Sequence, residues 1–224
     1  DQLYHSYAES VHGLDENIGR VLDALRSLNL DQNTLVLYLG DNGFHLGEHG
    51  FYDKRDAFET SIRIPMLAWA PTQIPAGSRV DAMVQNIDIA ATVLAATSVP
   101  APTSAQLDGQ SFWPLLQGHD IPWRDHLLYE YHWEWNFPAT PTLFAIRTDR
   151  FKFVFHHGTW DRDCFFDLHT DPLERHNLID VPGYQEQIAQ LRTQLFTELE
   201  ASGGLNLPVR IPAGERLDQR KLPR

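Results

Sequence analysis

Hydrophobic residues recur every three to four positions over residues 7–28, and charged residues occupy many of the positions between them. This spacing predicts an amphipathic helix with one apolar face. Residues 35–39 follow as an unbroken apolar run, Leu-Val-Leu-Tyr-Leu, which is too short for a typical helix. We expect this run to form a strand that is buried on both faces. A helix followed by such a strand is typical of a parallel sheet that helices cover.

Two further elements are expected before residue 122. Residues 61–70 predict a second strand, and Pro65 places it at an edge or a bulge because proline cannot donate a ladder hydrogen bond. Residues 89–96 predict an alanine-rich helix. Asp88 precedes that helix at its positive end, where a carboxylate is stabilised. We therefore favour a structural role for Asp88 over a functional one.

The pattern changes near residue 122, where aromatic and β-branched residues begin to alternate. The alternation predicts a small antiparallel sheet, whose candidate strands are residues 126–131, 143–148, 151–155 and 164–168. Residues 184–200 carry apolar side chains in helical register and predict a closing helix. The chain is thus expected to divide into a large α/β domain over residues 1–121, a small sheet-plus-helix subdomain over 122–203, and a tail over 204–224.

Composition narrows the classes of function. The chain has 224 residues, of which 42% are hydrophobic, and this is ordinary for a globular protein. Its net charge of −12 argues against nucleic acid or an anionic membrane surface as a partner. No apolar run approaches the roughly 20 residues that a membrane span requires. The single cysteine, Cys164, excludes an intrachain disulfide.

The candidate chemistry begins directly after the apolar run, where Asp41 and Asn42 stand between two glycines. In open α/β sheets, ligands collect at the carboxyl ends of strands, and two adjacent oxygen-bearing side chains suit a hard divalent cation. Asp-Asn-Gly is also ordinary turn chemistry, so both interpretations stay open on these residues alone.

A loop rich in ionisable groups follows, with His45, Glu48, His49, Lys54 and Arg55 among its residues. Loops of this kind present chemistry more often than they serve as packed connectors. Residues 45–49 also fit the reversed zinc-peptidase pattern H-x-x-E-H. That motif needs a helix, and three glycines within residues 43–50 each disfavour a helix by about 1 kcal/mol. We therefore favour a different use for these side chains.

The sequence GDNGFHLGEHG at residues 40–50, with YDKR at 52–55 and RIPML at 63–67, resembles the second half of a type I, formylglycine-dependent sulfatase of the alkaline-phosphatase superfamily. The segment FDLHTDPLERHNL at residues 166–178 resembles the C-terminal signature of the same family. The likeness covers nearly the whole chain and is strongest to bacterial sulfatases of the N-acetylglucosamine-6-sulfatase kind. The implied fold is the C-terminal part of a mixed sheet covered by helices, followed by the small antiparallel subdomain.

The resemblance also implies roles for individual residues. Asp41 and Asn42 match ligands of the family cation, which is usually calcium, with magnesium as an alternative. Lys54 matches the lysine that contacts the sulfate. Further substrate contacts are assigned to side chains in the loop and near the small sheet, and these candidates are His45, His49, Arg55, His132, Trp133, Arg147 and Trp160. For each histidine and tryptophan a purely structural role stays open.

The family nucleophile is missing from this sequence. The Cys-x-Pro/Ala-x-Arg stretch, whose cysteine becomes formylglycine, has no match here, and Cys164 is followed by Phe165-Phe166-Asp167. We therefore expect the N-terminal half of the enzyme to supply the nucleophile and to be a partner of this chain. The resemblance implies a sulfated carbohydrate of the glycosaminoglycan type as substrate, and a periplasmic or secreted location. The alternatives are a phosphodiester or phosphonate monoester hydrolase of the same superfamily and a non-catalytic carbohydrate-binding remnant.

Overall fold

The computed structural model describes residues 2–104, 106–134, 136–158 and 161–206. Within it the chain forms two compact units. The first comprises Asp1–Glu48 and Ile62–Asp125, and the second comprises His49–Ser61 and His126–Arg224. Residues 49–61 thus pack with the second unit, although the chain returns to the first unit after them. None of the described helices is both long and apolar enough to cross a membrane.

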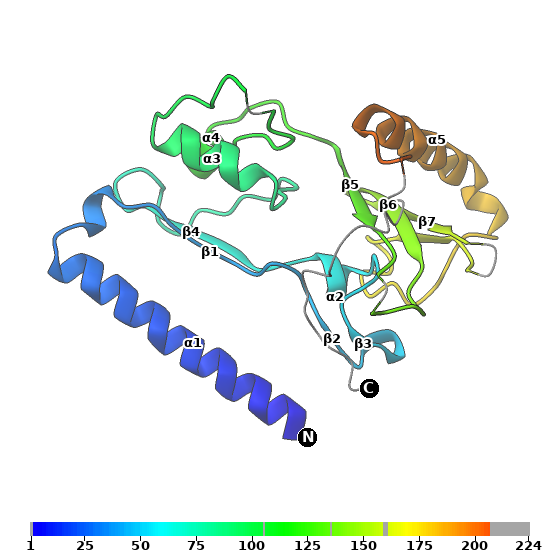
Figure 1. The fold of residues 1–224 in the computed structure, drawn as a ribbon, viewed down its shortest axis with the longest axis horizontal. Coiled ribbons are helices and arrows are strands. Elements are labelled where there is room, and N and C mark those ends of the chain that lie inside the picture. The colour runs from blue at the N-terminus through cyan, green and yellow to red at the C-terminus, as the bar shows by residue number, and fades with distance from the viewer. Residues whose placement is uncertain (1, 105, 135, 159–160, 207–224) are drawn as a thin grey trace, which may run out of the picture. The chain divides into compact units, whose positions relative to one another are not determined.

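The first unit contains the helices α1 (Gln2–Ser27), α3 (Asp88–Ala96) and α4 (Trp113–Leu116), the 3-10 helix η1 (Asp31–Asn33), and the strands β1 (Val36–Leu39), β2 (His45–Leu46) and β4 (Met66–Trp69) (Figure 1). The amphipathic helix expected over residues 7–28 is confirmed in α1. Its apolar face is only partly covered by the described residues, since Ile18, Leu22 and Leu25 are half-buried and no residue of α1 is fully buried. Val11 and Val21 on this helix are 47% and 57% exposed.

Strand β1 differs from the expectation in its pairing. It pairs antiparallel with β4, with Val36 opposite Trp69 and Leu39 opposite Met66. The expected parallel order is therefore wrong for this pair, because the chain turns back after β1 and runs beside it. All four side chains of β1 are half-buried, so the described residues by themselves do not bury both faces of this strand.

Strand β4 is shorter than the expected strand over residues 61–70. The chain is helical in α2 (Glu59–Ile62) and becomes extended only at Met66, directly after Pro65. A proline has no amide hydrogen to give to a ladder, so the strand begins where hydrogen-bond donors become available.

Asp88 has the structural role that the sequence favours. Its side chain is fully buried at the start of α3, and its carboxylate accepts hydrogen bonds from the backbone N–H groups of Gln85 and Gln110 at 2.7 and 2.8 Å. Arg124 donates to both carboxylate oxygens, at 2.5 and 2.6 Å. The backbone at Gly109 passes so close to Ile87 that a Cβ there would lie 2.0 Å from the Ile87 carbonyl oxygen. The segment that follows Gly109 is thereby held against α3.

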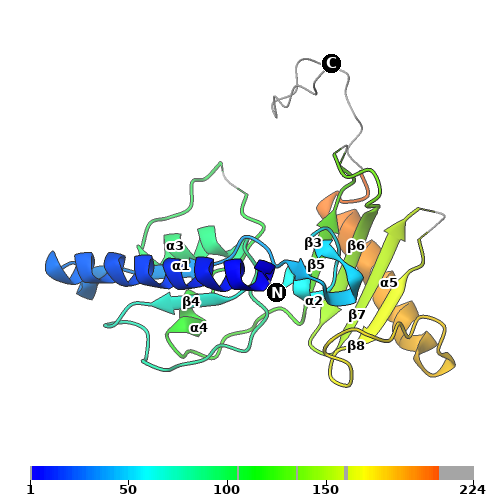
Figure 2. The same cartoon turned by 90° about the horizontal axis from the view of Figure 1, so that it is seen from below.

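The second unit is built on a four-stranded antiparallel sheet in the order β5-β6-β7-β8, with bounds β5 (His126–Tyr131), β6 (Thr142–Thr148), β7 (Phe151–His157) and β8 (Cys164–Asp167). Its other elements are η2 (Glu48–Gly50), β3 (Tyr52–Asp53), η3 (Pro182–Tyr184) and α5 (Gln185–Ser202). Helix α5 covers one face of the sheet (Figure 2). The expected small sheet and closing helix are both confirmed.

The side chains of the sheet alternate between two cores. On one face Phe144, Ile146, Phe153 and Phe165 pack against Leu191, Leu195 and other apolar residues of α5. Leu195 is fully buried, and removing such a side chain from water contributes about 1.5–3 kcal/mol. On the opposite face Leu143, Ala145 and Val154 pack with Ala57. Residues 49–61 therefore lie on the face of the sheet that α5 leaves uncovered.

Candidate active site

Asp41 and Asn42 lie in the first unit, two and three residues after the end of β1. Asp41 is exposed and Asn42 is half-buried. The Asn42 amide donates to the Asp41 carboxylate at 2.9 Å, and the Asn42 side-chain nitrogen donates to the Gly43 carbonyl at 2.7 Å. The side chain of Asn86 donates to the Asp41 carbonyl at 2.8 Å. These bonds fix the turn that carries both side chains.

The donor chemistry of this turn fits part of a calcium or magnesium shell. A carboxylate and a carboxamide are hard oxygen donors, and Ca²⁺ takes about 6–8 such ligands while Mg²⁺ takes about six. No group of three or more His, Cys, Asp or Glu side chains that could hold a metal occurs among the described residues. Asp41 and Asn42 thus offer two hard oxygen donors, fewer than either ion takes.

The zinc-peptidase alternative does not fit the local backbone. His45 begins β2 and is fully buried. His49 has φ 54° and ψ 13°, a left-handed conformation that no helix residue adopts. A helical H-x-x-E-H pair would need both histidines in one regular helix, and neither lies in one.

Lys54 and Arg55 lie in the second unit, directly after Asp53, whose φ is 124°. Lys54 is half-buried. Arg55 forms an ion pair with Asp53, lies 3.4 Å from the Glu134 carboxylate, and places its guanidinium 3.2 Å from the centre of the Phe137 ring. Arg55 is thus engaged by residues of its own unit, which fixes the backbone on the C-terminal side of Lys54.

The loop before Lys54 is packed through aromatic contacts. The His49 ring stacks on the Phe58 ring with centroids 3.9 Å apart, and Phe58 also contacts Phe51 and Phe166. Phe166 belongs to β8, so Phe58 ties residues 49–61 to the sheet.

A network of buried charges joins the same segment to the sheet. Lys152 on β7 is fully buried, and its ammonium lies 2.8 Å from the Glu59 carboxylate and 2.7 Å from the Glu174 carboxylate. It also donates to the Ala57 carbonyl at 2.7 Å. Arg147 on β6 lies 3.4 Å from the other oxygen of Glu59. The two cations and two carboxylates give this network no net charge.

The two carboxylates of the network respond differently to burial. Burial alone raises the pKa of Glu59, but the charges and hydrogen bonds of Lys152 and Arg147 outweigh it and hold that pKa below its usual value. Burial raises the pKa of Glu174, and Lys152 offsets this only in part. The difference follows from the number of cations, since Glu59 has two beside it and Glu174 has one.

The remaining candidates lie on or near the small sheet. Trp133 is 47% exposed, and its indole N–H donates to the Pro138 carbonyl at 3.2 Å. His132 is half-buried and lies 3.4 Å from Glu130, with its ring edge-on to Phe144. Trp160 lies outside the described residues. Arg147 faces Glu59, as described above, so its guanidinium is already engaged within the protein.

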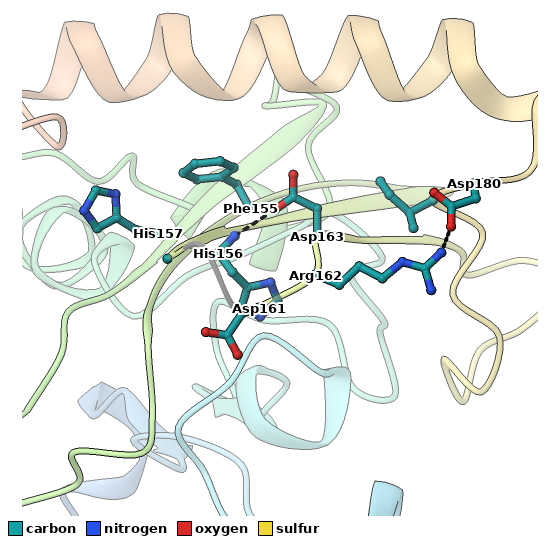
Figure 3. A pocket seen from close by; sticks show the side chains of 9 residues that line it. Phe155, His156, His157, Asp161, Arg162, Asp163 and Asp180 are labelled. Carbon is teal, nitrogen blue, oxygen red and sulfur yellow. Dashed lines mark hydrogen bonds and ion pairs between the residues drawn. The ribbon is translucent and has the colours of Figure 1, made fainter.

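A pocket of about 620 Å³ lies at the end of β7, beside residues 161–163 (Figure 3). Its rim includes His156, His157, Asp161 and Asp163, and Arg162 pairs there with Asp180. The His156 amide donates to the Asp163 carboxylate at 3.1 Å. Burial lowers the pKa of the His156 imidazole, so this ring is neutral at pH 7.

Comparisons with known proteins assign the chain to a family. The family model "N-sulphoglucosamine sulphohydrolase, C-terminal" matches residues 47–201, which is more than half of the chain. The chain belongs to this sulfatase family. It is 34% identical over 205 residues to an N-acetylglucosamine-6-O-sulfatase of Bacteroides thetaiotaomicron, and the match covers 89% of this chain and 36% of that enzyme. The chain thus spans little more than a third of that relative.

Solved structures of other proteins share the fold. One, a protein in complex with its substrate D-glucosamine-2-N,6-O-disulfate, is 32% identical with a TM-score of 0.79 over 87% of this chain and 40% of the other. A phosphonate monoester hydrolase of Agrobacterium radiobacter is 25% identical, with a TM-score of 0.74 over 84% of this chain and 39% of that one. The resemblance to sulfatases of the alkaline-phosphatase superfamily is confirmed.

Sequence reasoning missed the buried network. Lys152 stands in the apolar strand Phe-Lys-Phe-Val-Phe, where a lysine is out of place in a predicted buried strand, and this was an available signal. Glu174 lies within the family-like segment at 166–178, but nothing in its spacing links it to Glu59. Its contact with the Glu59 amide spans 115 positions.

Proposed function

We propose that this chain is the C-terminal part of a sulfuric ester hydrolase that removes sulfate from a sulfated carbohydrate, with glucosamine 6-sulfate in a glycosaminoglycan as the substrate class. The observation that carries this proposal is the family match together with the 34% identity to an N-acetylglucosamine-6-O-sulfatase. The proposed location is periplasmic or secreted, where such polymers are encountered.

Each chemical task of ester hydrolysis is proposed for a named residue. Asp41 and Asn42 contribute a carboxylate and a carboxamide oxygen to a calcium shell, with magnesium as an alternative. When bound there, the cation would polarise the sulfuryl oxygens. Lys54 places its ammonium at the sulfate, where a compact positive charge stabilises an oxygen that gains negative charge as the ester breaks.

The nucleophile is proposed to lie in an N-terminal half, as formylglycine, because Cys164 cannot supply it. Cys164 is followed by Phe165-Phe166-Asp167 and so lacks the sequence context that the resemblance requires for formylglycine. Its unmodified thiol is also a poor nucleophile, because burial raises its pKa to about 11. The first unit also leaves apolar residues of α1 exposed, as a partner polypeptide or upstream segment would require. This chain would then hydrolyse no ester by itself.

Sugar recognition is proposed for side chains that present aromatic or imidazole groups. Trp133 offers an exposed indole face of the kind on which sugar rings pack, and His132 lies beside it in the sequence. His49 remains a proposed substrate contact of the loop, whereas His45 is fully buried and is proposed to have a structural role instead. Because Arg55 and Arg147 are each paired with carboxylates of their own unit, we propose that they act mainly by holding the site together.

A second candidate is a phosphonate monoester hydrolase, which is favoured by the structural likeness to the Agrobacterium radiobacter enzyme. The same cation and lysine would serve phosphoryl transfer, since both esters place negative charge on equatorial oxygens.

One experiment separates the two candidates. The complete enzyme is assayed with 4-nitrophenyl sulfate, N-acetylglucosamine 6-sulfate and 4-nitrophenyl phenylphosphonate, each with calcium and with EDTA. We expect cation-dependent turnover of both sulfate esters and much slower turnover of the phosphonate. Preferential turnover of the phosphonate would support the second candidate. Absence of turnover on all three substrates would contradict both and favour a binding role.

A further inference from the structure

The segment that carries Lys54 is held to the sheet at several backbone and side-chain positions. The Lys152 ammonium donates a hydrogen bond to the Ala57 carbonyl at 2.7 Å, and the Glu59 N–H donates to the Glu174 carboxylate at 2.6 Å. Both contacts fall within five residues of Lys54, on its C-terminal side. All these residues belong to the second unit.

The geometry of Glu174 is itself fixed by its surroundings. Its φ of 52° is uncommon for glutamate, and its N–H donates to the Asp171 carbonyl at 3.0 Å. Downstream, Asn177 accepts the Phe165 N–H at 3.0 Å and donates to the Asp163 carbonyl at 3.0 Å. The segment around Glu174 is therefore attached to β8, and it presents one carboxylate oxygen to Lys152 and the other to Glu59.

Stability alone explains this arrangement poorly. A lysine is almost never fully buried, and removing ions from water costs several kcal/mol for each ion, so a buried ion pair often contributes no more than apolar side chains of the same volume. What apolar side chains cannot do is bind a backbone carbonyl and a backbone N–H at fixed points. Lys152 binds the Ala57 carbonyl, and Glu174 binds the Glu59 N–H.

We propose that Glu174 and Lys152 are positioning residues for Lys54, which fix the backbone of residues 54–59 so that the Lys54 ammonium meets the substrate sulfate. This inference rests on the proposed function, because it takes the role of Lys54 from there. Glu59 completes the network of buried charges by bridging Lys152 to Arg147, so that the two cations of neighbouring strands share one carboxylate.

The most informative variant is Glu174→Gln, which keeps the side-chain shape. Glu174 uses two acceptor oxygens, one for Lys152 and one for the Glu59 N–H. A glutamine has only one acceptor oxygen, so it loses one of the two contacts whichever way its amide is turned. The matched control is Asp167→Asn, which weakens another buried carboxylate pair of the same unit, with Arg150 at 2.7 Å, that has no contact with residues 54–59 among the described bonds.

The kinetic test is a double-mutant cycle in the complete enzyme with N-acetylglucosamine 6-sulfate. We expect Glu174→Gln to lower kcat by about 10- to 100-fold, the scale of a displacement of about 1 Å, with a smaller change in KM. In the Lys54→Ala background the same substitution should change kcat less than about twofold, because its effect passes through Lys54. Asp167→Asn should lower the melting temperature and leave kcat unchanged. An equal loss of kcat in both backgrounds, or no loss in folded Glu174→Gln, would overturn the proposal.

A second measurement does not depend on activity. Hydrogen exchange at the amides of residues 54–59 should be at least about 10-fold faster in Glu174→Gln than in wild type, and unchanged in Asp167→Asn. Unchanged exchange in Glu174→Gln would refute the positioning role even if the protein proves to hydrolyse another ester. Faster exchange in Glu174→Gln, together with no sulfatase activity in wild type, would instead refute the proposed function. It would still support the role of Glu174 in fixing the backbone of residues 54–59.

Discussion

Arg147 on β6 and Lys152 on β7 lie directly opposite each other in the sheet, and both side chains face residues 49–61. Like charges at such positions repel. Glu59 resolves the repulsion because its two carboxylate oxygens reach the two cations. The ion pairs of Glu59 with both cations explain why the segment after Lys54 packs with the second unit, although the chain then continues into the first unit.

The first prediction concerns the stability of this network. Lys152→Met leaves Glu174 buried without its cation, and breaking a buried pair in this way should lower the free energy of unfolding by about 3–5 kcal/mol. The double variant Lys152→Met/Glu174→Gln removes both charges and should recover part of the loss. Urea unfolding measures both. A double variant less stable than Lys152→Met would contradict the ion-pair explanation.

The second prediction concerns the cation. Asp41→Ala in the complete enzyme should abolish calcium-dependent turnover, because a methyl group offers the ion no ligand. Asp81→Ala is a suitable control, since Asp81 is an exposed aspartate of the same unit that pairs only with Arg79 in the described contacts. Calcium binding by calorimetry should be weakened in the first variant and unchanged in the second. Undiminished activity of Asp41→Ala would remove Asp41 from the ligand set.

The third prediction concerns Lys54. If its charge acts on the sulfate as the ester breaks, Lys54→Ala should lower kcat by about 100-fold or more. Arg192→Ala, which removes an exposed cation on α5, should leave kcat unchanged. A change confined to KM would show that Lys54 binds the substrate without assisting the reaction.

The fourth prediction concerns acid stability. Hydrogen bonds from Arg150 hold the pKa of Asp167 below its usual value, so the unfolded chain binds more protons than the folded chain at acidic pH. The stability gained from this pair is therefore present above the pKa of the unfolded state, about 4, and is lost as the pH falls through the folded pKa. Wild type should exceed Asp167→Asn in stability at pH 7, and this advantage should shrink by pH 3. An advantage that is constant over this range would show that Asp167 does not titrate as described.

The fifth prediction concerns Cys164. With a pKa of about 11, its thiolate fraction at pH 8 is about 10⁻³, so iodoacetamide should modify the native protein far more slowly than a free cysteine peptide. Modification should become fast in 6 M guanidinium, where the thiol is exposed. Rapid alkylation of the native chain would contradict the described burial.

Local patterns in the sequence predict the helices and strands. Strand pairing and side-chain contacts depend on residues that are far apart in the sequence, so local patterns do not predict them. The closing helix followed from the spacing of Ile188, Leu191 and Leu195, because α5 buries that stripe on the sheet. The antiparallel partner of β1 could not be read from its own residues, since pairing depends on how the chain returns. The place of Arg147 near the predicted sheet suggests a sugar contact. Its neighbour Glu59, 88 positions away, became visible only in the fold.

We propose that this chain provides one part of a sulfatase site and that an upstream part provides the nucleophile. The most direct test is sulfate release from N-acetylglucosamine 6-sulfate, measured for the isolated 224-residue chain and for the same chain joined to its upstream sequence. We predict no release from the isolated chain and cation-dependent release from the joined protein. Release by the isolated chain, or none by the joined protein, would contradict the claim.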